Sequence, residues 1–294
     1  MIVVKLWGGL GNQMFQYAFG YCLAKSTNQD LKFDCSFYAN QPVYTGKRDV
    51  EIDRLNVHRV ENFYPNKRIK ILSNRYCGAI LRKFPPFFIP VEKGMVYLKE
   101  PLHKYVEKIH HKKNVYYDGY WQTSKYFKDY RDDLINLFMP KNGFSKEEET
   151  LFSMLKKEES VAVHIRKGDF ANKSVRKVGH LLPISYYENS MKFFRKTIEK
   201  PVFFIISDDP TWAKSQFEGA SDIKFVSDYC KGNMLTDLFS IANCKHGVMS
   251  ASTFSWWGNW LRKTPGTVVV PNGTYYNEFF YESEWIKIDF NEVN

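Results

Sequence analysis

Short apolar runs rich in β-branched residues alternate with longer segments of helical periodicity through the second half of the chain. The runs predict strands near 160–165, 202–206, 223–226, 246–249 and 267–270, and the segments between them predict helices near 184–198, 211–217, 234–243 and 253–262. Strands that alternate with helices in this way are typical of a doubly wound parallel sheet. The second half therefore predicts an α/β domain.

The first half begins with a similar pattern. Residues 2–6 predict a strand, residues 14–25 a helix that packs on a sheet, and residues 31–33 a second strand. A further strand is expected over 115–122, followed by a helix.

The alternation breaks at residues 140–146, before a charged helix expected over 147–157. We therefore predict an N-terminal Rossmann-like domain over 1–145 with a helical insertion, and a C-terminal domain over 146–294.

Residues 37–113 show no clear hydrophobic period and carry basic and aromatic clusters at 67–70 and 82–88. One interpretation of this region is a helical insertion with a solvated basic face. The other is contact with an anionic membrane or a lipid-linked acceptor. We favour the insertion, because no clean amphipathic helix emerges from the pattern.

The composition narrows the classes of partner. The 294 residues carry a formal net charge of +10, which favours phosphorylated small molecules, nucleic acid or an anionic membrane. The five cysteines are widely spaced and include no Cys-x-x-Cys pair, which argues against a disulfide framework and a zinc site. With no export signal and no apolar run near the ~20 residues of a spanning helix, we expect a cytoplasmic protein, peripheral to the inner face of the membrane if the basic region binds lipid.

The strand expected over 160–165 ends in a charged cluster. The cluster comprises His164, Arg166, Lys167, Gly168 and Asp169. Open α/β sheets hold ligands at the carboxyl ends of their strands, and arginine binds phosphate oxygens through paired N–H groups. The alternative is a solvated turn in which an Arg166–Asp169 pair stabilises little. We favour an anion-binding role.

A glycine-rich turn joins the first predicted strand to the first predicted helix. Gly9 and Gly11 would let backbone N–H groups approach a phosphate or a sugar closely. The turn is similar to a dinucleotide fingerprint, but Met14 occupies the third glycine position, and the amides Asn12 and Gln13 are not needed in a nicotinamide site. A dehydrogenase is therefore the weaker interpretation.

Four hydroxyl residues crowd the start of the helix expected over 253–262. They are Ser250, Ser252, Thr253 and Ser255. Hydroxyl groups, backbone N–H groups and the helix dipole together make an anion site, whereas simple N-capping explains one of the four. The acidic pair Asp208-Asp209 before Pro210 is predicted to cap the helix that follows.

Four segments together resemble the bacterial-type α1,2-fucosyltransferases. They are the Gly-Gly-Leu-Gly-Asn-Gln opening at 8–13, Gly119-Tyr120-Trp121-Gln122, the His-Ile-Arg-Lys-Gly-Asp-Phe motif at 164–170, and Ser252-Thr253-Phe254-Ser255-Trp256-Trp257. The resemblance implies a metal-independent, inverting enzyme without a cofactor, on a GT-B-like fold of two Rossmann-like domains with a donor-binding cleft between them. It further implies transfer of L-fucose from GDP-L-fucose to the 2-hydroxyl of a terminal galactose in an oligosaccharide or a lipid-linked glycan.

The resemblance also implies roles for donor-binding residues in the C-terminal domain. Arg166 matches the catalytic arginine that binds the donor diphosphate, and His164 matches the histidine beside the nucleotide. Asp237 lies where related enzymes read guanine, and Ser252 and Thr253 match hydroxyls that contact phosphate. We also assign Gly9, Gly11, Asn12 and Gln13 to donor binding.

An inverting transfer calls for a base near the acceptor hydroxyl. Asp169 is our first candidate, although pairing with Arg166 would lower its pKa and weaken it as a base. Asp118 is the second candidate. Asp118, Trp121 and Gln122 are also expected to bind the acceptor, because aromatic faces pack on sugars and amides bond hydroxyls, even though aromatic residues at a strand end are more often core.

Two competing interpretations remain open at this point. One is another fucosyl linkage on the same fold, and the other is a basic nucleotide- or nucleic-acid-binding protein without transferase activity. Nucleic-acid binding predicts cations that follow phosphates along one face. Here the polar residues gather at strand ends with glycines and hydroxyls, as a small-ligand site requires. We therefore expect GDP-L-fucose and a galactoside as partners, with no nucleic acid and no metal.

Overall fold

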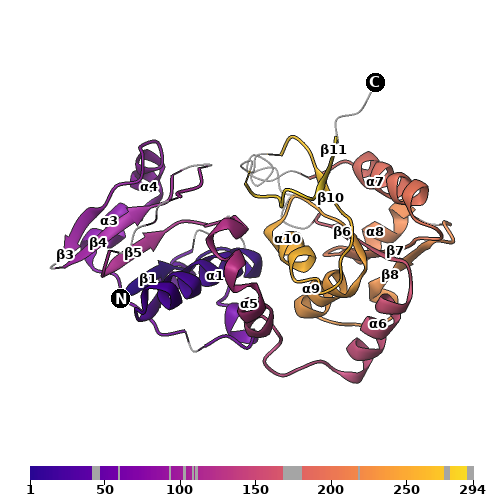
Figure 1. Cartoon of the computed structure of the whole chain (residues 1–294), viewed down its shortest axis with the longest axis horizontal. Coiled ribbons are helices and arrows are strands. Elements are labelled where there is room, and N and C mark those ends of the chain that lie inside the picture. The colour runs from indigo at the N-terminus through magenta and orange to yellow at the C-terminus, as the bar shows by residue number, and fades with distance from the viewer. Residues whose placement is uncertain are drawn as a thin grey trace. The chain divides into compact units, whose positions relative to one another are not determined.

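The computed structural model describes residues 1–41, 47–58, 60–92, 94–101, 104–107, 109, 112–167, 181–217, 219–274 and 279–289. The chain divides into two compact units, each with its own β-sheet (Figure 1). Unit 1 comprises Met1–Lys141 and Tyr276–Phe280. Unit 2 comprises Asn142–Tyr275 and Tyr281–Asn294.

Unit 1 is built on a five-stranded sheet with the order β2-β1-β5-β4-β3. Its strands are β1 (Ile2–Lys5), β2 (Leu31–Asp34), β3 (Ile89–Glu92), β4 (Met95–Lys99) and β5 (Val115–Asp118). Neighbouring strands are parallel, except that β3 runs antiparallel to β4. The strand order reverses between β1 and β5, so the carboxyl ends of these two strands mark the topological switch point of the sheet.

Helices cover both faces of this sheet. They are α1 (Leu10–Thr27), α2 (Ser36–Ala39), α3 (Lys67–Leu72), α4 (Arg75–Leu81) and α5 (Arg131–Leu137), with single 3₁₀ turns η2 (Ile52–Arg54), η3 (Ser124–Tyr126) and η4 (Lys128–Tyr130). On the face covered by α1, Phe19 meets Tyr117 of β5 edge to face. On the opposite face, Ile69 and Leu72 of α3 and Leu81 of α4 pack against β1, β3, β4 and β5. The inner sides of α3 and α4 are thereby buried in the core.

Unit 2 is built on a six-stranded, fully parallel sheet with the order β11-β10-β9-β6-β7-β8. Its strands are β6 (Ser160–Ile165), β7 (Val202–Ser207), β8 (Ile223–Phe225), β9 (His246–Val248), β10 (Val268–Pro271) and β11 (Ile286–Ile288). Counted from β6, this is the strand order of the dinucleotide-binding Rossmann fold. The switch point lies between β6 and β9, where such folds hold their ligands.

The helices of unit 2 are α6 (Lys146–Lys157), α7 (Ile184–Thr197), α8 (Pro210–Phe217), α9 (Met234–Asn243) and α10 (Thr253–Trp260), with the 3₁₀ turn η6 (Val226–Asp228). α9 packs between α6 and α10. The approach of α9 and α10 is close because Gly258 has no side chain, and a Cβ there would lie 2.7 Å from Ile241. Trp256 and Trp257 are fully buried and fix α10 in the core.

The predicted α/β class with two Rossmann-like sheets is confirmed, and all five strands expected in the second half are present. The first helix begins at Leu10 rather than at residue 14, because polar amides in its first turn hide its start in the sequence. The region without a clear period contains α3, α4 and the strand pair β3–β4. Within the described ranges, no helix combines the length and the apolarity that a membrane crossing requires.

Candidate active site

The switch point of the unit 2 sheet is bridged by a hydrogen bond between two strand ends. Nδ1 of His164, in β6, lies 2.8 Å from Oγ of Ser250, which follows β9. His164 is 3% exposed. Burial lowers the pKa of His164 to about 4, although the negative charge of Asp208 opposes this effect. The ring is therefore neutral at physiological pH and can accept or donate a hydrogen bond beside a ligand without adding charge.

Two cations follow β6 and are held by the acidic pair that follows β7. Nε of Arg166 lies 3.3 Å from Oδ2 of Asp208, and the backbone N–H of Lys167 donates to Oδ1 of the same carboxylate at 2.8 Å. Nζ of Lys167 lies 2.8 Å from Oδ2 of Asp209. Asp209 also accepts the N–H of Trp212, so the predicted helix cap is present. The ion pairs were not predicted from the sequence, because they depend on β6 and β7 being neighbours.

The hydroxyl cluster at the start of α10 is mostly used within the protein. Ser252 caps α10 by accepting the N–H of Phe254, and Ser255 accepts the N–H of Ser250. Ser250 in turn bonds His164. Within the described part of the chain, only the Thr253 hydroxyl of the four has no hydrogen-bond partner. N-capping and local bonds thus explain more of this cluster than the sequence suggested.

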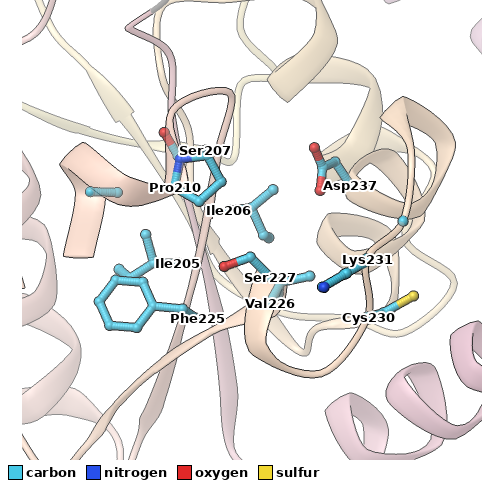
Figure 2. Close-up of a pocket in the computed structure, with 12 residues that line it drawn as sticks. Ile205, Ile206, Ser207, Pro210, Phe225, Val226, Ser227, Cys230, Lys231 and Asp237 are labelled. Carbon is cyan, nitrogen blue, oxygen red and sulfur yellow. The ribbon is translucent and has the colours of Figure 1, made fainter.

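A pocket of about 240 Å³ lies at the carboxyl ends of β7 and β8 (Figure 2). Its lining includes Ile206, Ser207, Phe225, Val226, Ser227 and Asp237. Figure 2 shows the Asp237 side chain, from the first turns of α9, facing the residues of β7 across the pocket. The lining combines apolar side chains with two hydroxyls, the cation Lys231 and the single carboxylate of Asp237, which suits a flat ring with polar edge groups.

The environment of Asp237 is unusual for a carboxylate. Enclosure by the protein raises its pKa to about 7, and the nearby charge of Asp208 adds to this shift. No described residue donates a hydrogen bond to it. Native proteins rarely leave an enclosed carboxylate without donors, because its desolvation is then not compensated. Such a group at the rim of a pocket is a candidate for ligand recognition.

The switch point of the unit 1 sheet carries an aromatic pair. Trp7 follows β1 and Tyr120 follows β5, and their rings stack with centroids 4.0 Å apart. The Trp7 indole N–H donates to the carbonyl of Gly119 at 3.3 Å. The guanidinium of Arg82 lies 5.8 Å from the Trp7 ring and 5.7 Å from the Tyr120 ring. Trp7 was not among the predicted site residues, since a single aromatic residue after a strand carries no distinct signal.

Asp118, whose side chain is fully buried, forms an ion cluster with two lysines near this pair. Nζ of Lys99 lies 2.7 Å from Oδ1 of Asp118, and Nζ of Lys5 lies 3.7 Å from Oδ2. The Tyr97 hydroxyl donates to Oδ2 at 2.7 Å. Burial alone would raise the pKa of Asp118, but the two lysines outweigh it and hold the pKa below its usual value. A carboxylate so paired is a weak base, and its side chain is 0% exposed.

The other predicted residues of unit 1 hold the turns in place. The Gln13 amide bonds four backbone groups: it donates to Gly8 and Asp49 carbonyls and accepts the N–H groups of Glu51 and Ile52. Gln13 is therefore a structural clamp for the loop that follows α2.

The remaining predicted positions are also part of the framework. The Gln122 amide donates to Oδ1 of Asn12 at 2.9 Å, which joins the two predicted groups. Gly9 is the N-cap of α1, and Gly11 lies in its first turn. Trp121 is fully buried and stacks on Phe19 of α1. The predicted base Asp169 lies outside the described residues.

A carboxylate that the sequence did not suggest supports the β5 turn. Glu100 accepts the backbone N–H groups of Tyr120 and Trp121 at 2.5 and 3.0 Å. Its enclosure raises its pKa to about 7. Trp121 has a positive φ of 58°, and a Cβ on Gly119 would lie 2.4 Å from Glu100, so the turn requires this glycine. Glu100 fell in the region without a clear period, where no signal marked it.

A Rossmann-like sheet with an arginine after one strand and an enclosed carboxylate beside a neighbouring pocket is an arrangement that suits a nucleotide-dependent transferase. The model of glycosyl transferase family 11 matches residues 91–293. The chain is 30% identical to the α-1,2-colitosyltransferase of Escherichia coli, over 98% of this chain and 99% of that protein. The chain therefore belongs to glycosyl transferase family 11.

Other relatives are also glycosyltransferases by name. The chain is 29% identical to the O-antigen biosynthesis glycosyltransferase WbnK of Escherichia coli, over 90% of this chain and 91% of that protein. It is 28% identical to human galactoside α-(1,2)-fucosyltransferase 1, over 44% of this chain and 34% of the human protein. Among solved structures, the fucosyltransferase NodZ from Bradyrhizobium is similar with 13% identity and a TM-score of 0.49, over 87% of this chain and 91% of that one. Within the described residues, no group of three or more His, Cys, Asp and Glu is placed to hold a metal ion.

Proposed function

We propose that this protein moves L-fucose from GDP-L-fucose to the 2-hydroxyl of a terminal galactose, with inversion at the sugar carbon. The observation that carries the proposal is the Asp237 carboxylate, which has no donor among the described residues and faces a pocket of about 240 Å³. Guanine offers a ring N–H and an amino N–H side by side, and a carboxylate accepts both. Membership of a glycosyltransferase family leaves the dehydrogenase and nucleic-acid interpretations without support.

The diphosphate is proposed to lie between the ends of β6 and β9. Arg166 would bind its oxygens there, with its guanidinium oriented by Asp208 through Nε at 3.3 Å. The start of α10 adds the Thr253 hydroxyl and backbone N–H groups, whose partial positive charge favours an anion. The neutral His164 ring lies beside this position, as its bond to Ser250 requires.

The proposed reaction breaks the bond between the sugar C1 and the diphosphate oxygen, and the electron pair stays on GDP. The acceptor 2-hydroxyl forms the new bond to C1 and loses its proton. Negative charge thus develops on the diphosphate, where Arg166 and the α10 start stabilise it. Asp169 remains our proposed base for the hydroxyl proton. Asp118 is the weaker choice, because its buried pairing with Lys99 and Lys5 leaves it little basicity.

The acceptor is proposed to bind in unit 1 at the switch point of the sheet. The aromatic pair of Trp7 and Tyr120 offers a flat apolar surface for the C–H face of galactose. The predicted acceptor residues Trp121, Gln122 and Asp118 would then act indirectly, since they support the turn that presents Tyr120. Trp7→Ala should raise the KM for the acceptor about fivefold to tenfold, the loss of ~1 kcal/mol of ring contact, and leave GDP affinity unchanged.

The test of the proposal is GDP release from GDP-L-fucose, measured with and without lactose in excess EDTA. Lactose-dependent release is expected, and NMR of the product should show an α1,2 linkage. Unchanged release with lactose, together with tight GDP binding, would mean that galactose is not the acceptor. No binding of GDP or GDP-fucose would overturn the donor assignment.

GDP-colitose is the second candidate donor, because the 30% identity with an α-1,2-colitosyltransferase extends over 98% of this chain. Colitose differs from fucose in lacking the 3-hydroxyl group. A site that bonds this hydroxyl would reject colitose strongly, whereas a site that merely tolerates it would discriminate weakly. Comparison of kcat/KM for the two donors distinguishes the two functions.

A further inference from the structure

Exposed large hydrophobic side chains are concentrated on one segment of unit 1, residues 64–88, which we call the α3–α4 surface. Among the described residues, eight large hydrophobic side chains are strongly exposed. Six of them belong to this surface: Tyr64, Ile71, Tyr76, Ile80, Phe84 and Phe87. Tyr64 is 86% exposed and Tyr76 is 72% exposed. Soluble proteins seldom expose a group of apolar side chains in one region unless that region binds a partner or a membrane.

The same segment is strongly basic. It contains six cationic residues: Lys67, Arg68, Lys70, Arg75, Arg82 and Lys83. No Asp or Glu occurs anywhere from residue 62 to residue 91. The positive charge is therefore not compensated within the segment, and the complementary partner is an anionic one.

The exposed apolar residues do not belong to the core of unit 1. The inner sides of α3 and α4 already pack on the sheet through Ile69, Leu72 and Leu81. Ile71, Tyr76 and Ile80 of the same two helices point to solvent. Both sides of each helix are apolar, which is why no amphipathic period is visible in the sequence. The outer face of α3 and α4 is therefore both basic and apolar, and not a solvated basic face alone.

We propose that the α3–α4 surface binds an anionic phospholipid bilayer. The aromatic and aliphatic side chains would enter the boundary between headgroups and acyl chains, and the lysines and arginines would contact lipid phosphates. Aliphatic Ile71 and Ile80 fit an acyl environment and offer nothing to a nucleic-acid strand, which binds through phosphate contacts and base stacking. This lipid binding goes beyond the proposed transfer reaction and does not depend on it.

The position of Arg82 connects the surface to the unit 1 site. Arg82 is the C-cap residue of α4, and its guanidinium lies over the stacked rings of Trp7 and Tyr120. A bilayer bound by the α3–α4 surface would therefore lie close to the aromatic pair. This geometry suits an acceptor glycan carried on a membrane lipid.

The experiment is co-sedimentation of the full chain with vesicles of phosphatidylcholine alone, or mixed with phosphatidylglycerol. We expect binding to the mixed vesicles that weakens with salt, and at least tenfold weaker binding to phosphatidylcholine alone. An apolar variant, Tyr76→Ser with Ile80→Ser and Phe84→Ser, should lose at least tenfold of the binding. A charge variant, Lys67→Gln with Arg68→Gln and Lys70→Gln, should lose a similar factor. All six positions are exposed, so both variants should retain the fold.

Matched controls come from unit 2. The variant Tyr229→Ser with Ile286→Ser removes the other two exposed large hydrophobic side chains of the described residues, and Lys156→Gln with Lys157→Gln removes exposed charge. Both control variants should bind the mixed vesicles like the wild type.

Equal binding of both vesicle types, or no effect of the apolar variant, would overturn the proposal. In the second case, heparin binding that the charge variant abolishes would identify a general polyanion surface instead. GDP release with soluble lactose should be unchanged in both surface variants, which separates this test from that of the transfer reaction.

Discussion

The two units of this glycosyltransferase differ in the partners that they give to a carboxylate near the carboxyl ends of their strands. In unit 1, Asp118 at the end of β5 is paired with Lys99 and Lys5 and accepts the Tyr97 hydroxyl. In unit 2, Asp237 faces a pocket, and no described residue donates a hydrogen bond to its carboxylate. The first arrangement compensates a buried charge within the protein, and the second leaves the compensation to a ligand.

The direction of the pKa shifts expresses the same difference. The lysines hold the pKa of Asp118 below its usual value in spite of burial, whereas enclosure raises the pKa of Asp237 to about 7. A carboxylate that stabilises its own fold is already paired with cations and hydrogen-bond donors of the protein. A ligand-binding carboxylate is left without such partners, which lowers the stability of the free protein. The stability of variants therefore distinguishes the two roles.

The largest effect should come from the arginine of the unit 2 site. Arg166→Ala should lower kcat/KM for transfer by about a hundredfold to a thousandfold, the range found when a preorganised donor to a developing anion is removed. Steady-state GDP release measures this. Arg195→Ala is the matched control, because Arg195 forms a bidentate pair with Asp222 away from the site. That variant should keep its activity and lose less than about 1 kcal/mol of stability. Near-normal turnover of Arg166→Ala would contradict the mechanism.

The second effect concerns the unit 1 cluster. Asp118→Asn should lower the free energy of unfolding by about 3 kcal/mol, because Lys99 and Lys5 are left without their counter-charge. Urea denaturation measures the loss. The double variant Asp118→Asn with Lys99→Met should recover part of it, since it removes the uncompensated cation as well. GDP affinity should stay at the wild-type value. A variant as stable as the wild type would show that the cluster has no structural role.

Asp237→Asn should have the opposite effect on stability. The folded pKa of about 7 lies above the value of 3.8 for a free aspartate, so the folded state binds more protons between these pH values. Wild-type stability should therefore fall as pH rises from about 4 to 7, by an amount on the order of 3 kcal/mol. The asparagine variant cannot ionise and should be the more stable protein at pH 8, but not at pH 4. Denaturation across this range measures the difference.

Ligand binding should show the reverse dependence on pH. The carboxylate of Asp237 must be ionised to accept two donors from guanine, so the wild-type affinity for GDP should weaken up to tenfold per unit below pH 7. Calorimetric titration of Asp237→Asn corrects for the titration of GDP itself. The variant should also bind GDP and ADP with similar affinity. Retained preference for GDP would mean that Asp237 does not recognise the base.

The fold was predictable from the sequence where burial is complete. Strands β6, β7 and β10 are buried on both faces and therefore read as continuous apolar runs. β11 was missed, because the edge strand Ile286–Ile288 is largely exposed and carries a lysine. The position of the charged residues 164–167 at the end of a buried strand was predictable, because one segment supplies them.

Contacts between distant segments were not predictable from the sequence. The pairing of Arg166 with Asp208 follows from the order of the sheet, and the support of Tyr120 by Glu100 follows from the positive φ of Trp121. Neither the sheet order nor this backbone angle leaves a pattern in the sequence. The sequence alone does not distinguish the two uses of a buried amide such as Gln13, because a clamp on the backbone and a ligand contact require the same group.

The smallest expected effects come from two hydroxyl variants at the start of α10, which distinguish N-capping from anion binding. Ser252 accepts the N–H of Phe254, so Ser252→Ala should cost about 1 kcal/mol of stability as a lost N-cap. The Thr253 hydroxyl has no hydrogen-bond partner in the described part of the chain, so Thr253→Val should leave stability unchanged. If the hydroxyl bonds the diphosphate, Thr253→Val should weaken GDP binding several-fold, in keeping with ~1 kcal/mol for one hydrogen bond. Guanosine, which lacks the phosphates, should bind this variant like the wild type. An equal loss for guanosine and GDP would mean that Thr253 contacts the nucleoside, and no loss for either would leave anion binding to Arg166 and the backbone of α10.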